Sequence, residues 1–198
     1  MCGIFGIAKS QINLKEYDNI LKDIKLYVKY NEIRGSDTFG ISFKLENENI
    51  LYKINEKPSS ALKKKNYNNF LNKYLKNNFP KNLMTIGQTR LVTNGSKFSY
   101  SNNQPLQTSN ILGVHNGIFT NLDENLETHK TKNYESYNVK SDSLIFYEKL
   151  SKISEQSNFI YNLYDYLKKI VGNYSIAFFL KNENKIFISS NFGSLYYF

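Results

Sequence analysis

The chain has one cysteine, no tryptophan and only three prolines among its 198 residues. A single thiol cannot form an internal disulfide, and disulfides are characteristic of proteins from oxidising compartments. We therefore expect a protein of the reducing cytoplasm. One cysteine and two histidines, His115 and His129, are also too few for a structural zinc site, so we expect no metal and no cofactor.

Long hydrophobic runs are absent as well. The longest apolar stretch, residues 176–180 (IAFFL), is far shorter than the roughly 18 residues of a membrane-spanning helix. Residues 2–8 are mostly apolar, but no basic segment precedes them, as one would in a signal peptide. We expect a soluble protein without membrane contact, and the length predicts one domain, residues 1–198.

Acidic residues are outnumbered by basic ones, 17 against 26, which gives a net charge of +9. A basic surface can bind nucleic acid. Here the basic residues are mostly lysines scattered among asparagine-rich stretches such as residues 63–78. We interpret the charge as compositional bias and expect no nucleic-acid partner. A basic RNA-binding protein is an alternative, which would need aromatic and basic residues on one sheet face.

The apolar periodicity predicts an α+β domain without internal repeats. Strands are predicted at residues 1–8, 39–45, 50–54, 83–91, 111–115, 174–180 and 185–190. Helices are predicted at residues 15–31, 141–150 and 159–170, and in the segment with Tyr67, Phe70, Leu71, Tyr74 and Leu75. Asn13 and Ser141 are suited to N-caps, and Gly172 to the residue after a C-cap.

The position of the single cysteine is the first chemical signal. Removal of Met1 would place a thiol and a free α-amine together on Cys2. The amine, with an unperturbed pKa of about 7.7–8.0, can accept the thiol proton and leave the nucleophilic thiolate. A cysteine in an apolar strand is more often a small core residue, so the choice depends on the rest of the chain.

Residues 1–6 (MCGIFG) resemble the opening of the class II glutamine amidotransferases, which are N-terminal-nucleophile hydrolases. Further segments match the family in order: residues 34–40 (RGSDTFG), 87–95 (GQTRLVTNG), 103–105 (NQP), 113–117 (GVHNG) and 140–143 (KSDS). Residues 172–190 resemble its closing hairpin. Each match is weak alone, whereas the ordered set is a strong joint signal. The resemblance implies a four-layer αββα sandwich of two mostly antiparallel sheets between helical layers.

For catalysis, the resemblance implies that Cys2 is the nucleophile. It implies that the Asn116 side-chain amide and the Gly117 backbone N–H donate hydrogen bonds to the oxyanion that develops on the substrate amide. Asn116-Gly117 is also a dipeptide that forms turns readily, and both readings can hold. Arg34 and Asp37 would support the surroundings of the nucleophile. An ion pair between them at a strand end is the competing interpretation.

For substrate recognition, the resemblance assigns the α-carboxylate of glutamine to Arg90, a hydrogen bond to Thr93 and the α-ammonium to Asp142. Each has a structural alternative: a surface ion pair for Arg90, a turn residue for Thr93 and a helix-dipole contact after the Ser141 cap for Asp142. The sequence departs from the family at Gln88, where a histidine is usual, and at Asn94, where the sugar-aminating branch also has a histidine. His115 is interpreted as a packed strand residue rather than a general base.

The function implied is release of ammonia from L-glutamine through a γ-glutamyl thioester on Cys2. The ammonia would pass to an acceptor on a separate synthase subunit or a missing C-terminal synthase domain. The segment at residues 114–118 (VHNGI) is closer to the sugar-aminating branch and residues 103–105 to the purine branch; we expect an amino-sugar pathway with a sugar-phosphate acceptor. The alternative is a non-catalytic, glutamine-binding regulatory subunit with the same fold.

Overall fold

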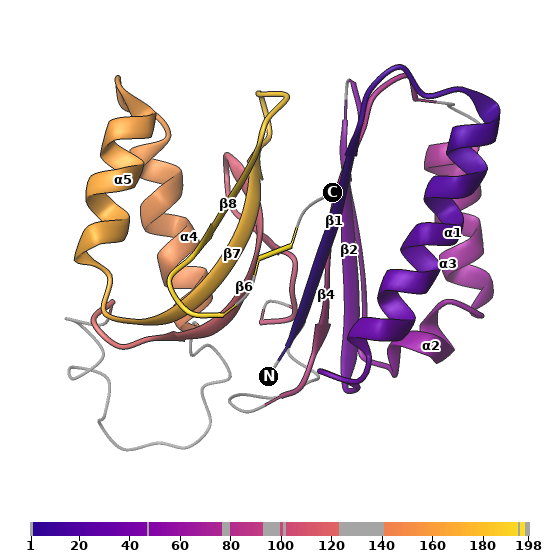
Figure 1. Ribbon diagram of the computed structural model, residues 1–198, viewed down its shortest axis with the longest axis horizontal. Helices are drawn as coiled ribbons and strands as arrows, with labels where there is room; N and C mark the ends of the chain where they lie inside the picture. Colours follow the sequence, from indigo (N-terminus) through magenta and orange to yellow (C-terminus); the bar gives the residue numbers. More distant parts are fainter. Residues whose placement is uncertain are drawn as a thin grey trace.

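Two antiparallel sheets lie face to face between two layers of helices in the computed structural model (Figure 1). The structure describes residues 2–46, 48–76, 80–92, 100, 102–122, 141–193 and 195–196. One sheet has the strand order β1-β4-β2-β3 and the other β5-β6-β7-β8. The α+β four-layer sandwich predicted from the sequence is confirmed.

The first half of the chain builds one sheet and its helical layer. Its elements are β1 (Gly3–Lys9), α1 (Leu14–Asn31), β2 (Thr38–Lys44), β3 (Asn49–Ile54), α2 (Pro58–Ala61), α3 (Lys65–Leu71), the π-helical segment η1 (Asn72–Lys76) and β4 (Leu83–Arg90). The helix α1 and the β2–β3 hairpin are where the periodicity predicts them. The short helix α2 was not predicted; it begins with Pro58, which suits the first turn of a helix.

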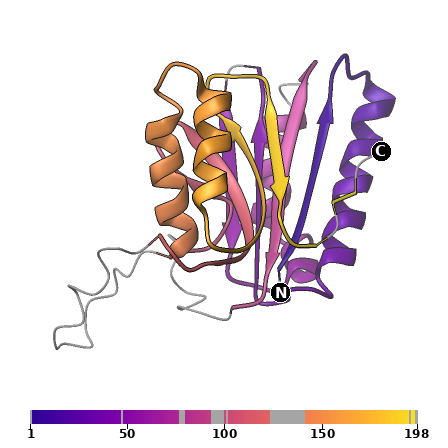
Figure 2. The ribbon, with the colours of Figure 1, turned by 60° about the vertical axis from the view of Figure 1, so that its left-hand side comes forward.

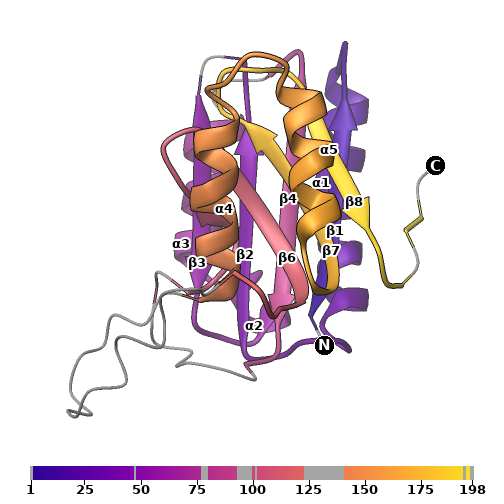
Figure 3. The same cartoon turned by 90° about the vertical axis from the view of Figure 1, so that its left-hand side faces the viewer.

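The second half builds the other sheet and the helices that lie side by side over it in Figure 3. Its elements are β5 (Leu106–Gln107), β6 (Ile111–Phe119), α4 (Asp142–Ile153), α5 (Phe159–Lys169), β7 (Gly172–Leu180) and β8 (Ile186–Ser190). The two-residue strand β5 is too short for a periodic signal. Ser141 is the N-cap of α4, as predicted, whereas α5 has its C-cap at Ile170, so Gly172 already begins β7.

The strand β6 is longer than predicted. We expected it to end at His115, but it continues to Phe119, and Asn116 and Gly117 pair with Ser175 and Tyr174 of β7. The interpretation of Asn116-Gly117 as a turn is therefore wrong. Pairing along the full length of β7 keeps the segment extended despite the preference of this dipeptide for turns.

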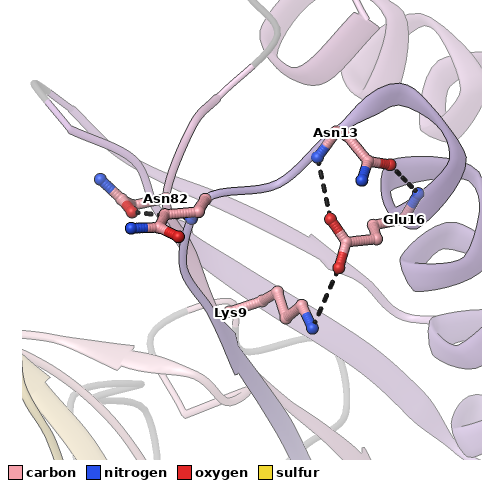
Figure 4. Close-up of polar contacts among 5 residues, drawn as sticks. Lys9, Asn13, Glu16 and Asn82 are labelled. Atoms are coloured by element: carbon pink, nitrogen blue, oxygen red, sulfur yellow. Dashed lines mark hydrogen bonds and ion pairs between the residues drawn. The ribbon is translucent and has the colours of Figure 1, made fainter.

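The start of α1 shows how local sequence fixes an element. The Asn13 side chain accepts a hydrogen bond from the Glu16 amide at 3.0 Å, and Glu16 accepts one from the Asn13 amide at 3.0 Å (Figure 4). This reciprocal pair satisfies two amides that a helix start leaves without partners. Lys9, at the end of β1, forms an ion pair with the same Glu16 at 3.2 Å. The bonds therefore set where the chain turns from strand to helix.

Three apolar clusters hold the layers together. One lies between α1, α2, α3 and the first sheet, and a second between α4, α5 and the other sheet. A smaller third cluster lies between the sheets and contains Ile86, Leu112, Val114, Ala177 and Phe179. Burial of such side chains is the main stabilising contribution to a fold. Among the helices within the described residues, none is both long and apolar enough to cross a membrane.

Candidate active site between the sheets

Strand alternation directs the side chains of Arg90 and Asn116 into the space between the sheets. Ile86 and Val114 belong to the apolar cluster between the sheets, and successive side chains of a strand point to opposite faces. Arg90 therefore shares the inner face of β4 with Ile86, and Asn116 shares that of β6 with Val114. Cys2 stands two residues before Ile4, which also packs against this cluster. The start of β1 and the end of β4 lie together at the lower end of the sandwich in Figures 1 and 2.

Cys2 contacts three parts of this end. Its backbone nitrogen donates to Asn116 Oδ1 at 3.1 Å, which links the first sheet to the second. Its Sγ lies 3.9 Å from the carbonyl oxygen of Leu91, the residue after Arg90. Its own carbonyl accepts from Arg34 Nε at 3.3 Å. Cys2 is half-buried, so the thiol is neither sealed in a core nor fully in solvent. It is not the small core residue of the alternative interpretation.

Gly117 follows Asn116 with a φ of +142°, a conformation that favours glycine. A Cβ at this position would lie 1.9 Å from the carbonyl oxygen of Asn173 in β7. Glycine is thus required for β6 and β7 to remain paired next to Asn116. The side-chain amide of Asn116 and the backbone amide of Gly117 are adjacent, at the edge of the site.

Arg90, the last residue of β4, is partly buried. Its Nη1 donates to Asn103 Oδ1 at 2.6 Å, and Asn103 is itself fully buried. Burial lowers the pKa of the guanidinium, while Cys2, Asp37 and Asp142 act in the opposite direction. Arg90, the residue assigned to the α-carboxylate of glutamine, therefore interacts electrostatically with both Cys2 and Asp142.

The segment from Arg34 to Asp37 braces the end of β4. Asp37 Oδ2 accepts from the Val92 amide at 2.8 Å, and the Asp37 amide donates to the Arg90 carbonyl at 2.9 Å. A Cβ on Gly35 would lie 2.5 Å from the Thr89 carbonyl oxygen, so only glycine permits this close approach. Arg34 and Asp37 contact different backbone groups rather than forming the ion pair of the alternative interpretation.

Asp142 begins α4 and is tied to the end of β6. Its Oδ2 accepts from the Phe119 amide at 3.0 Å and its Oδ1 from the Ser143 amide at 2.7 Å. The bond to its neighbour Ser143 is the helix-start contact of the alternative interpretation, whereas the bond to Phe119 reaches another element. The charge of Asp142 also partly opposes the lowering of the His115 pKa by burial.

His115 is a packed strand residue. It is 2% exposed, its Nδ1 lies 2.7 Å from Ser143 Oγ, and its ring stacks on Phe119 with 4.0 Å between centroids. Burial lowers its pKa to about 4, against the opposing effect of Asp142. A neutral, buried imidazole that stacks on an aromatic ring is poorly placed to exchange protons with a substrate.

Gln88, the departure from the family, connects the two sheets. It lies on β4 with 1% exposure, and its Nε2 donates to Gln104 Oε1 at 3.0 Å and to the His115 carbonyl oxygen at 2.6 Å. The strand predicted at residues 83–91 already contains this position, and the structure shows that the side chain is buried. The two inner-face residues Ile86 and Arg90 on either side of it in the sequence would have placed it there. Thr93 and Asn94 lie outside the described residues.

The lowered pKa of His115 predicts a pH dependence of stability. In the unfolded chain a histidine has a pKa of about 6.5, so between pH 6.5 and 4 the unfolded state binds a proton that the folded state does not. The contribution of neutral His115 is complete above pH 6.5 and is lost as the pH falls toward 4. The total loss should be about 3 kcal/mol, measured by urea unfolding at several pH values.

The other histidine provides the matched control for this experiment. His129→Gln should keep the slope of the unfolding free energy between pH 6.5 and 4, and His115→Gln should flatten it. A slope that disappears in His129→Gln and persists in His115→Gln would contradict the assignment.

The sequence is similar to one curated relative along almost its whole length. It is 30% identical over 203 residues to the glutamine–fructose-6-phosphate aminotransferase (isomerizing) of Buchnera aphidicola subsp. Acyrthosiphon pisum (strain APS). The match covers 98% of this chain and 29% of the relative. The chain thus spans less than a third of that protein. No protein-family model matches the sequence.

Solved structures share the fold at low sequence identity. The glutamine phosphoribosylpyrophosphate amidotransferase of B. subtilis, complexed with ADP and GMP, gives a TM-score of 0.54 at 18% identity, over 94% of this chain and 36% of that one. The allosteric regulatory enzyme of purine biosynthesis gives a TM-score of 0.57 at 19% identity, over 94% of this chain and 37% of that one. Together with the ordered motifs from Cys2 onward, the match to the curated relative identifies the chain as a class II glutamine amidotransferase domain, and the solved structures support its fold.

Proposed function

We propose that the chain is an active glutaminase domain, residues 1–198, in which Cys2 attacks the side-chain amide of L-glutamine after removal of Met1. The observation that carries this proposal is the contact between the Cys2 nitrogen and Asn116 Oδ1 at 3.1 Å. It brings the nucleophile, its future α-amine and an oxyanion donor together from two different sheets. Arg34, hydrogen-bonded to the Cys2 carbonyl, holds the residue at this end of β1.

The geometry supports proton transfer by the α-amine. Once Met1 is removed, the amine donates one N–H to Asn116 Oδ1, so its lone pair is directed elsewhere and can accept the thiol proton. The thiolate attacks the γ-carbonyl to form a tetrahedral intermediate, and the amine returns the proton to the leaving nitrogen. The C–N bond then breaks, so that ammonia departs and the γ-glutamyl thioester remains on Cys2. Water then attacks the thioester, which gives glutamate and restores the thiol.

Asn116 has a second role in this scheme. Because Oδ1 faces the Cys2 nitrogen, the Nδ2 group points to the other side of the amide, where it can donate to the developing oxyanion. The Gly117 N–H supplies the second donor. Such donors, fixed before the reaction begins, stabilise the charge that appears in the transition state.

The charged ends of the amino acid are assigned to opposite charges near Cys2. Arg90 binds the α-carboxylate, Asp142 binds the α-ammonium and Thr93 adds a hydrogen bond. The electrostatic interactions of Arg90 with both Cys2 and Asp142 support this assignment, because the two ends of glutamine must be held around the reacting amide.

The ammonia acceptor is proposed from the curated relative. That protein is named for the pair glutamine and fructose 6-phosphate, and this chain covers 29% of it. We propose a sugar phosphate as acceptor, bound by a synthase domain or a separate synthase subunit, in an amino-sugar pathway. An unpaired catalytic thiol fits the reducing cytoplasm.

Direct assay of products tests the proposal. Chain lacking Met1, as verified by intact mass, should convert L-glutamine into equal amounts of glutamate and ammonia. L-Asparagine, which is one methylene shorter, should give neither, because its amide carbon cannot reach Cys2 while its charged ends are held. Binding of L-glutamine without either product would instead indicate the non-catalytic regulatory subunit.

A further inference from the structure

A chain of side-chain amides leads from the β2–β3 hairpin to Arg90. Asn103 Oδ1 accepts from Arg90 Nη1 at 2.6 Å, and Asn103 Nδ2 donates to Asn55 Oδ1 at 2.6 Å. Asn55 directly follows β3. The orientation of the Asn103 amide is thereby fixed, since turning it over would set N–H against N–H at Arg90 and oxygen against oxygen at Asn55.

The backbone of Asn103 is anchored from the same hairpin. Lys53 Nζ donates to the Asn103 carbonyl at 2.8 Å and to the Tyr100 carbonyl at 3.0 Å, and it lies 4.4 Å from the centre of the Tyr100 ring. Burial lowers the pKa of Lys53 to about 8. The two hydrogen bonds from this buried lysine to main-chain carbonyls hold the segment around Asn103 in place.

The partner of Arg90 at this position is an amide rather than a carboxylate. A neutral acceptor satisfies a buried guanidinium N–H without adding a negative charge, whereas an aspartate at this position would add one. A guanidinium that keeps its charge in a partly buried place can attract an incoming carboxylate strongly, because water screens the interaction less there.

We propose that Asn103, fixed by Asn55 and Lys53, is a positioning residue that aims Arg90 at the α-carboxylate of the substrate and so determines selectivity for a free α-amino acid. This inference rests on the proposed glutaminase function. In this proposal Asn103 acts through Arg90 and takes no part in the thioester chemistry at Cys2.

The test compares L-glutamine with L-glutaminamide, in which a carboxamide replaces the α-carboxylate. In Asn103→Leu, KM for glutamine should rise roughly 10-fold to 100-fold, the effect of losing a hydrogen bond to a charged group, with kcat within about twofold. The preference for glutamine over glutaminamide should fall by a similar factor. Asn66→Leu, which removes an exposed amide on α3, is the matched control and should change neither value.

A second variant separates aiming from mere packing. Asn103→Asp keeps an acceptor for Arg90 but places a negative charge beside it and loses the donor to Asn55 Oδ1, so the variant should remain folded and still have a raised KM. Recovery of the native KM in Asn103→Asp, or an unchanged preference between the two ligands in a folded Asn103→Leu, would overturn the proposal.

Binding by calorimetry in a Cys2→Ala background distinguishes this inference from the proposed function. There the Asn103→Leu substitution should weaken glutamine binding and leave glutaminamide binding almost unchanged. Glutamine binding that Asn103→Leu leaves intact would overturn the role of Asn103 alone. No glutamine binding at all in Cys2→Ala, with Asn103 native, would overturn both proposals.

Discussion

Replacing Cys2 by alanine should abolish glutamine hydrolysis, a loss on the order of 10⁴-fold or more in kcat. Cys2 is the only cysteine in the chain, so no neighbouring thiol can take over its role. Cys2→Ser should retain at most a small residual activity. A hydroxyl is much harder to deprotonate than a thiol, so an α-amine is a poor base for activating it. Glutamate release, followed over hours at high enzyme concentration, measures both losses.

The binding of glutamine by the same variants is the control. Arg90 and Asp142 are unchanged in Cys2→Ala, so the dissociation constant for L-glutamine should stay within a few-fold of the KM of the native chain. A Cys2→Ala chain that still releases glutamate would contradict the nucleophile assignment. A native chain that binds glutamine as tightly as Cys2→Ala and is equally inactive would favour the regulatory subunit.

Replacing Asn116 by aspartate should lower kcat by about 10²–10³-fold with little change in KM. Aspartate has nearly the same shape and still offers an oxygen to the Cys2 nitrogen, as Oδ1 does at 3.1 Å in the native structure. It lacks the Nδ2 donor, however, and places negative charge beside the developing oxyanion. It also favours the protonated α-amine, which cannot accept the thiol proton. Initial rates at saturating glutamine measure the effect.

Asn116→Ala serves as the comparison for this experiment. It removes the amine contact and the oxyanion donor together but adds no charge, so its loss in kcat should be no greater than that of Asn116→Asp. Unfolding midpoints show whether each variant remains folded, with the two sheets still packed together. An Asn116→Asp chain with kcat within tenfold of the native value would contradict the double role.

The periodic elements were predictable because their burial is one-sided. α1 has its buried residues Tyr17, Ile20, Ile24 and Val28 on one face, and its N-cap Asn13 with Glu16 is a local signal. Motif order also predicted which residues meet: Cys2 and Asn116 are 114 positions apart and in contact. Spacing alone would not have paired them, since the contact depends on how two sheets stack.

Other features depend on partners far away in the sequence. Asn116-Gly117 is a turn dipeptide by local preference, and only pairing with β7 keeps it in a strand. Gln88 stood out in the sequence only as a departure from the family's usual histidine, whereas the structure shows its amide bonded to Gln104 and to the His115 carbonyl oxygen across the sheets. The bond from Arg90 to Asn103 had no signal of its own, because a buried amide and a surface amide look alike in sequence.

The most direct test is the intact mass of the protein before and after incubation with 6-diazo-5-oxo-L-norleucine, a glutamine analogue that alkylates nucleophilic cysteines in glutamine sites. The proposed function predicts a starting mass without Met1, then one adduct per chain that L-glutamine prevents and that Cys2→Ala does not form. Retained Met1, or a native chain without Met1 that forms no adduct, would contradict Cys2 as an N-terminal nucleophile.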